Sequence, residues 1–136
     1  MKSAFCLVFL ASLFWTFGLG AMAAQQPDHR IYSDVRYIED AGDLVGSELE
    51  LDVRSEQVQG FLRSYQGGCG TNVIVSGTLL HDQIRLSGQS DEYGKIEITG
   101  HIETGKFNGT LTQKKPANSW REKLKLHRIP SPHCSD

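Results

Sequence analysis

The sequence of 136 residues carries a formal net charge of −2 at pH 7, and 39% of its residues are hydrophobic. This length fits a single domain with a short additional segment. Because a dedicated nucleic-acid-binding domain usually has a clear excess of lysine and arginine, the weakly acidic balance argues against that class of function.

The chain begins with the pattern of a secretory signal peptide. Lys2 is followed by an apolar run and then by the small residues "AMAA", which is the arrangement of a signal sequence and its cleavage site. We expect cleavage after Ala23, with Ala24 as the alternative site, so that residues 1–23 are the signal peptide and residues 24–136 form one domain. A retained membrane anchor is the rival interpretation, because the apolar run is almost long enough to cross a bilayer. We therefore expect a secreted or periplasmic protein without a membrane span.

Cleavage would leave two of the three cysteines, Cys69 and Cys134. Exported proteins fold in oxidising compartments, and two cysteines allow only one intramolecular pairing. A free pair or an intermolecular bridge is the alternative. We predict a Cys69–Cys134 disulfide that fastens the proline-containing C-terminal tail, which would otherwise fray. The cysteine in the glycine-rich stretch "GGCG" is then structural and not a nucleophile.

Residues 31–128 read as strands separated by short polar turns. The first predicted strand is 31–37, with weak alternation. In the second, 48–53, the residues Leu49, Leu51 and Val53 alternate with acids, which is typical of a half-buried strand. Six further segments show related patterns and are predicted as strands: 57–65, 72–80, 83–89, 95–103, 106–112 and 119–128.

Eight candidate strands with short connections predict an all-β fold, an antiparallel up-and-down meander or small barrel. A two-sheet β-sandwich is the alternative, since periodicity alone does not separate the two. An outer-membrane barrel is disfavoured because the strands are short and no aromatic girdles flank them. Five of the strands contain an apolar-x-Gly pattern that places glycine on the inward face, where it permits a sheet to coil sharply.

The eight-strand outline is similar to that of lipocalin-like and avidin-like barrels. The early Gly-x-Trp of the lipocalins is missing, and the several pocket tryptophans of the biotin-binding barrels are reduced to Trp120. A narrow aliphatic interior therefore predicts a packed core in place of a deep pocket. Under the alternative interpretation, the protein is a small barrel that carries an apolar molecule, and inward glycines such as Gly77 and Gly100 leave room for it.

No catalytic constellation stands out in the sequence. A Gly-x-Ser-x-Gly elbow and a P-loop are both missing, and the histidines are not spaced as metal ligands. The acids Glu48, Glu50 and Asp52 fit a solvated strand face better than a glycosidase pair. We expect no enzyme activity, no cofactor and no metal site. The sequon at Asn108 matters only in a eukaryotic secretory pathway, and whether Asn108 is glycosylated stays open.

Charge is distributed unevenly, with acids concentrated early and bases late. Arg121, Lys123 and Lys125 share one face of the last predicted strand. They are interpreted either as a solvated face that deters edge aggregation or as a docking surface for an anionic partner such as a polysaccharide, a lipid headgroup or an acidic protein. Phe61 and Tyr65 precede the glycine-rich loop, and either pack across strands or contact a partner.

These features together predict an exported, non-enzymatic binding protein. Its main predicted partner is a macromolecule, an unidentified protein or an anionic polymer, held through the outer face and loops. In a bacterial envelope this class includes hydrolase inhibitors and immunity-type proteins. The small-molecule carrier is the alternative function.

Overall fold

The computed structural model describes residues 26–134, so the predicted signal peptide and its cleavage site lie outside the described residues. No helix among residues 26–134 has the length and hydropathy needed to cross a membrane. The described chain folds into nine strands: β1 (Asp28–Ser33), β2 (Arg36–Ile38), β3 (Asp43–Arg54), β4 (Gln57–Gln66), β5 (Asn72–Leu80), β6 (Gln83–Ser90), β7 (Gly94–Glu103), β8 (Lys106–Lys114) and β9 (Ser119–Ile129).

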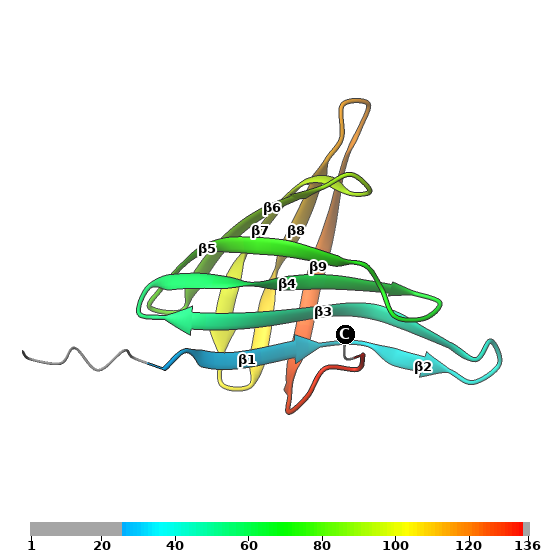
Figure 1. The fold of residues 1–136 in the computed structure, drawn as a ribbon, viewed down its shortest axis with the longest axis horizontal. Helices are drawn as coiled ribbons and strands as arrows, with labels where there is room; N and C mark the ends of the chain where they lie inside the picture. Colours follow the sequence, from blue (N-terminus) through cyan, green and yellow to red (C-terminus); the bar gives the residue numbers. More distant parts are fainter. Residues whose placement is uncertain (1–25, 135–136) are drawn as a thin grey trace, which may run out of the picture.

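Eight of these strands form a closed antiparallel barrel. Strands β3 to β9 pair in sequence order, and β1 closes the sheet by pairing with β9 on one side and β3 on the other. The short strand β2 extends the sheet beside β3. Figure 1 shows β1, β3, β4 and β5 running across the front of the molecule, with β7 to β9 crossing behind them. The up-and-down barrel is therefore confirmed, and the two-sheet sandwich is wrong.

The first predicted strand, 31–37, is interrupted in the structure. The chain turns at Asp34, whose backbone N–H donates to the carbonyl of Ser47 (3.1 Å) and whose Oδ1 accepts the N–H of Ser47 (2.7 Å). Gly46 has a φ of 130°, and a Cβ there would lie 2.8 Å from Val35 Cα. The β1–β2 corner thus crosses the neighbouring strand at a position that only glycine fills without strain.

The barrel interior is filled mainly by aliphatic side chains, as the period-two pattern predicts. Leu49 and Leu51 on β3 are fully buried, as are residues on every other barrel strand. The buried hydrophobic cluster is made of Tyr32, Leu49, Leu51, Val53, Val58, Leu62, Val73, Val75, Leu79, Ile84, Leu86, Ile96, Ile98, Phe107, Leu111, Leu124 and Leu126. One continuous core therefore runs through the barrel.

The inward glycines do not leave room for a ligand. A Cβ at Gly100 would lie 2.9 Å from Phe107 Cζ, and one at Gly109 would lie 2.6 Å from the same atom. The fully buried ring of Phe107 occupies the space that these glycines leave. At Gly77 a Cβ would collide with the backbone carbonyl of Arg85. The expectation that Gly77 and Gly100 make space for an apolar molecule is therefore wrong.

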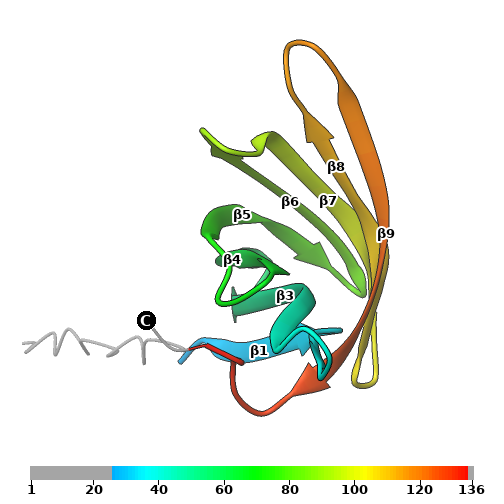
Figure 2. The same cartoon turned by 90° about the vertical axis from the view of Figure 1, so that its right-hand side faces the viewer.

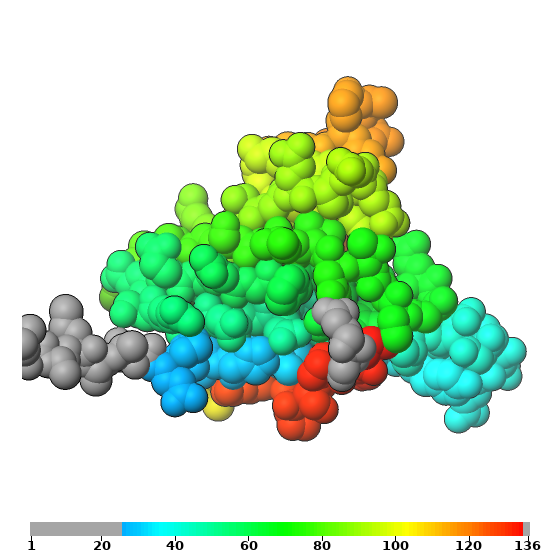
Figure 3. All heavy atoms as spheres, viewed as in Figure 1, coloured from blue at the N-terminus to red at the C-terminus, as the bar shows by residue number. Residues whose placement is uncertain are grey.

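The predicted disulfide between Cys69 and Cys134 is present. It joins the β4–β5 connection to the tail that follows β9, with 5.9 Å between the two Cα atoms. Figure 3 shows the C-terminal segment lying on the barrel surface beside β1. The tail is therefore held against the outside of the barrel, at the end where β4 and β5 are connected.

Candidate functional site

A cavity of about 370 Å³ opens at the end of the barrel that carries the β4–β5, β6–β7 and β8–β9 connections. We call it the mouth cavity. Residues of β3, β4, β5, β8 and β9 and of the β6–β7 turn line it: Gly46, Ser47, Leu62, Ser64, Tyr65, Gln66, Val73, Tyr93, Leu111, Gln113, Trp120 and Glu122. Its volume falls in the range of pockets that bind small molecules. The predicted packed core is present at the centre of the barrel, and the cavity at the mouth, which the sequence pattern did not predict, lies above it.

The floor of the mouth cavity is apolar and its lip is aromatic. Leu62, Val73 and Leu111 belong to the buried core and also line the cavity. Trp120 is 53% exposed, although it lies in phase with the inward residues of β9. It escapes burial because the β8–β9 hairpin extends beyond its neighbours, as Figure 2 shows. The strand pairing is consistent with this exposure, because β1 pairs with β9 only at residues 127–129 and does not reach Trp120.

Among residues 26–134, Glu122 is the one carboxylate in the wall of the mouth cavity. It lies in phase with the buried Leu124 and Leu126, so its side chain faces inward. Burial raises the pKa of Glu122, and the negative charge of Asp34 raises it further. Within residues 26–134, no hydrogen bond or ion pair joins Glu122 to another side chain. Its carboxylate is therefore available to a ligand.

Sequence reasoning overlooked Glu122. The sequence feature that could have identified it is its position, in phase with Trp120, Leu124 and Leu126. A strand that faces a packed core would carry an apolar residue there. An inward acid near the end of a barrel strand indicates a polar feature inside the mouth.

Tyr93 lies in the β6–β7 turn and lines the mouth cavity from there. Its backbone N–H donates to Ser90 Oγ (2.9 Å), which fixes the turn. The side chain is half-buried and packs against the core cluster. Burial, followed by the charge of Glu92, raises the pKa of the Tyr93 hydroxyl. The ring is neutral at physiological pH and contributes an aromatic surface to the cavity.

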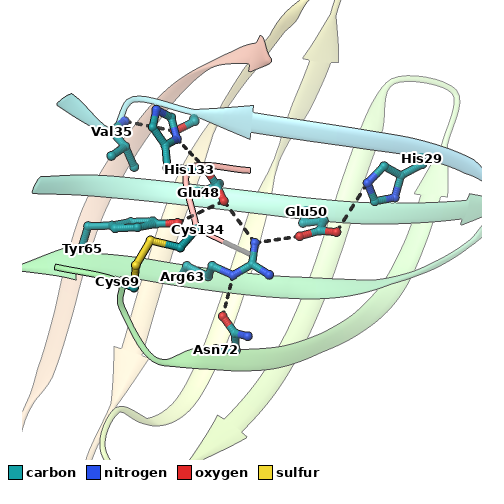
Figure 4. A network of polar contacts seen from close by, with 11 residues as sticks. His29, Val35, Glu48, Glu50, Arg63, Tyr65, Cys69, Asn72, His133 and Cys134 are labelled. Atoms are coloured by element: carbon teal, nitrogen blue, oxygen red, sulfur yellow. Dashed lines mark hydrogen bonds and ion pairs between the residues drawn. A yellow bond between two sulfur atoms is a disulfide. The ribbon is translucent and has the colours of Figure 1, made fainter. Parts of the chain in front are cut away.

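A buried polar cluster lies on the outer side of the same wall. Figure 4 shows the side chains of Arg63, Tyr65 and His133 converging on Glu48, which is fully buried. Glu48 Oε1 accepts hydrogen bonds from Arg63 Nη1 (3.1 Å) and from the Tyr65 hydroxyl (3.2 Å). Glu48 Oε2 lies 2.7 Å from His133 Nδ1 and accepts the backbone N–H of His133 (3.2 Å). We call these four residues the Glu48 cluster.

Arg63 extends the Glu48 cluster along the outer face. It donates to Glu50 Oε2 (2.7 Å) and to Asn72 Oδ1 (2.6 Å), and its guanidinium carbon lies 5.9 Å from the centre of the Phe61 ring. Burial by itself lowers the pKa of Arg63, but hydrogen bonds to Glu50 and Glu48 outweigh it and raise the pKa above its usual value. The expectation that Glu48 belongs to a solvated acidic stripe is therefore wrong.

The Glu48 cluster is not arranged for nucleophilic catalysis. Ser33 Oγ lies 3.5 Å from His133 Nδ1, which is the same ring nitrogen that contacts Glu48. A catalytic triad needs the nucleophile and the orienting acid on opposite nitrogens of the imidazole. The contacts instead fasten the tail to β3 and β4, whose next inward residues, Ser47 and Ser64, line the mouth cavity.

The structure separates the residues that the sequence singled out as binding candidates. Tyr65 is only 1% exposed, which agrees with the packing alternative and not with an exposed contact residue. Phe61 is half-buried beside Arg63 on the outer face of β4. Arg121, Lys123 and Lys125 are all exposed on β9, away from Phe61. Within the described range, no group of three or more histidine, cysteine or acidic residues could hold a metal ion.

No protein-family model matches the chain, and no curated protein matches it. A solved structure titled "Crystal structure of rhizavidin-biotin complex" is similar in fold, with a TM-score of 0.50 and 12% sequence identity. The match covers 82% of this chain and 100% of that chain. The barrel is avidin-like in architecture. At this identity the likeness shows the fold and not the ligand.

Proposed function

We propose that the protein is an exported, non-enzymatic binding protein that holds a small molecule in the mouth cavity. The observation that carries the proposal is a cavity of about 370 Å³ with an apolar floor and an aromatic lip, in a barrel that is otherwise filled. A concave apolar site with a few polar groups is the usual form of a small-molecule site. The likeness to a barrel whose structure contains biotin supports this class of ligand over a macromolecule.

Two features support export. The first residues have the signal-peptide pattern, and the Cys69–Cys134 disulfide fits an oxidising compartment. The same disulfide and the Glu48 cluster stabilise the wall that carries Ser47 and Ser64. A preformed wall lowers the ordering cost of binding.

Native mass spectrometry of the full chain purified from its source tests the proposal. We expect a retained small mass that is released on denaturation and reduced in a Trp120→Ala variant. Tyr37→Ala is the matched control, because Tyr37 is 60% exposed on β2 and does not line the cavity. A protein that carries no small mass, or retains it equally in both variants, would contradict the assignment to the mouth cavity.

A second candidate function is docking of an anionic macromolecule on the outer face of β9. Arg121, Lys123 and Lys125 are exposed, and within residues 26–134 none of them forms an ion pair. A row of unpaired bases attracts polyanions. We expect Lys123→Glu with Lys125→Glu to lower the salt concentration that elutes the protein from a heparin column. The control exchanges Arg85 and Lys106, two exposed bases on other strands, for glutamate; an equal loss in the control would refute a specific surface.

A further inference from the structure

The mouth cavity has a negative electrostatic character. Glu122 faces into it without a partner, and none of the residues that line it within the described chain is lysine, arginine or histidine. Asp34 lies close enough to act on Glu122 and adds a second negative charge beside the opening. A concave site with one sign of charge and apolar walls concentrates ligands of the opposite charge.

The aromatic residues of the cavity suit a cation as well. Trp120 lies two residues before Glu122 on β9, so both side chains project to the same side of the strand. Tyr93 contributes a second ring from the β6–β7 turn. Cations are attracted to the faces of such rings, most strongly to tryptophan. The carboxylate and the two rings together offer an amine both a charge partner and an aromatic surface.

The apolar floor of the mouth cavity determines which kind of group can lie beside the amine of the ligand. Leu62, Val73 and Leu111 are buried and offer no hydrogen-bonding side chain, so they favour a hydrocarbon or flat aromatic group. Polar side chains around them, such as Ser64 and Gln113, leave room for one or two hydrogen bonds. The cavity volume of about 370 Å³ limits the ligand to a small molecule.

We propose that the mouth cavity binds a small organic cation, with its protonated amine against Glu122 and its apolar body between Trp120 and the aliphatic floor. This rests on the proposed function of the cavity as a small-molecule site. An inward carboxylate without a partner is costly to ionise in a half-buried site, and a bound ammonium group removes that cost. A ligand with a free carboxylate, such as biotin, brings a further negative charge to Glu122 and Asp34. We therefore expect the ligand to differ in charge from the one in the rhizavidin complex.

Calorimetric titration of the full chain with three matched probes tests the inference. The probes are 2-phenylethylamine, 2-phenylethanol and 3-phenylpropionate, which share a phenyl group and differ in charge. We expect the amine to bind at least about tenfold more tightly than the alcohol, since a charge-assisted contact adds that much to a neutral one. The carboxylate should bind most weakly. In Glu122→Gln the affinity for the amine should fall about tenfold to that of the alcohol, with the alcohol unchanged.

The controls separate this inference from the proposed function. Glu56→Gln removes an exposed acid from the β3–β4 turn at the opposite end of the barrel, and should bind all three probes as the unaltered protein does. Urea unfolding of Glu122→Gln establishes that the variant is folded. Binding without preference for the amine, or a preference that survives Glu122→Gln, overturns the inference and leaves the small-molecule site standing. Failure of the amine to bind also overturns the inference, whatever native mass spectrometry shows. The proposed function itself falls if the protein carries no small mass in that measurement, or if Trp120→Ala and Tyr37→Ala retain that mass equally.

Discussion

Removing Glu48 should destabilise the barrel far more than removing an exposed acid. Glu48→Ala deletes the acceptor of hydrogen bonds from Arg63, Tyr65 and the backbone of His133. Arg63, a residue that is 5% exposed, then keeps only one of its two acidic partners, Glu50. Breaking a buried pair by removing one member costs about 3–5 kcal/mol. We expect a value near the lower limit, because Glu50 and Asn72 still accept hydrogen bonds from Arg63.

The assay is equilibrium unfolding in urea without reductant, so that the disulfide remains intact in every variant. With an m-value of about 1.5 kcal/mol/M, the unfolding midpoint of Glu48→Ala should fall by roughly 2 M. Glu56→Ala is the control and should change the free energy of unfolding by no more than about 0.5 kcal/mol.

A double-mutant cycle of Glu48→Met, Arg63→Leu and the double variant decides whether the loss comes from the buried charge of Arg63. Glu48→Met combined with Arg63→Leu removes both charges and should recover about 2 kcal/mol relative to Glu48→Ala, because buried ion pairs are often replaced by apolar residues at little cost. A loss below about 1 kcal/mol for Glu48→Ala, or strictly additive losses in the double variant, would refute the reasoning.

Three further predictions concern the tail and the core. Burial and the adjacent Glu48 raise the pKa of Tyr65 to about 12, so the stability that the neutral hydroxyl contributes is complete below about pH 10 and is lost as the pH rises through 12. Absorbance at 295 nm should show a late-titrating phase that loses the contribution of one tyrosine in Tyr65→Phe, while Tyr93, whose pKa is also raised, keeps its own contribution; an unchanged late phase would exclude this assignment. Replacing Cys69 and Cys134 by serine should lower the free energy of unfolding by up to about 4 kcal/mol, the loop-entropy value for about 65 residues, and a change within about 0.5 kcal/mol in urea would contradict a fastening role. Gly109→Ala should cost about 1–3 kcal/mol because its Cβ would meet both the backbone carbonyl of Thr99 and the Phe107 ring. Thermal unfolding of Gly109→Ala with Phe107→Leu should show partial recovery, since only the ring contact is relieved, and additive losses would count against the ring contact.

Alternation of side chains predicted most of the barrel strands and their inward faces. Leu49 and Leu51 on β3 and Leu124 and Leu126 on β9 are buried, as their period-two pattern indicates. The pattern does not encode which strand closes the sheet, since β1 pairs with β3 and β9 through backbone groups that every residue carries. The alternation does not predict the break at Asp34 for a related reason, because the break depends on two hydrogen bonds to Ser47 on the neighbouring strand β3.

The site was harder to predict because it depends on where elements end and on what covers them. Tyr65 lies on the polar face of its strand, and a local pattern assigns that face to solvent. The tail that buries it arrives from almost the other end of the chain through Cys134 and His133. Trp120 shows the opposite case, an inward residue left exposed because its hairpin extends past the rest of the barrel.

The path of the tail has a consequence for how quickly the mouth cavity exchanges its contents. The chain from Cys69 passes through β5 to β9, crosses over β1 and β3, and returns to Cys69 through the disulfide. This closed covalent ring contains β5 to β9 and the tail, and the tail lies over β1 and β3. Because the tail holds β1 in place, the ring limits sideways separation of β1 from its neighbours, so a ligand of the proposed site would enter and leave through the mouth, past Trp120. Opening the ring by reduction should therefore shorten the residence time of a bound molecule more than it weakens the contacts within the cavity.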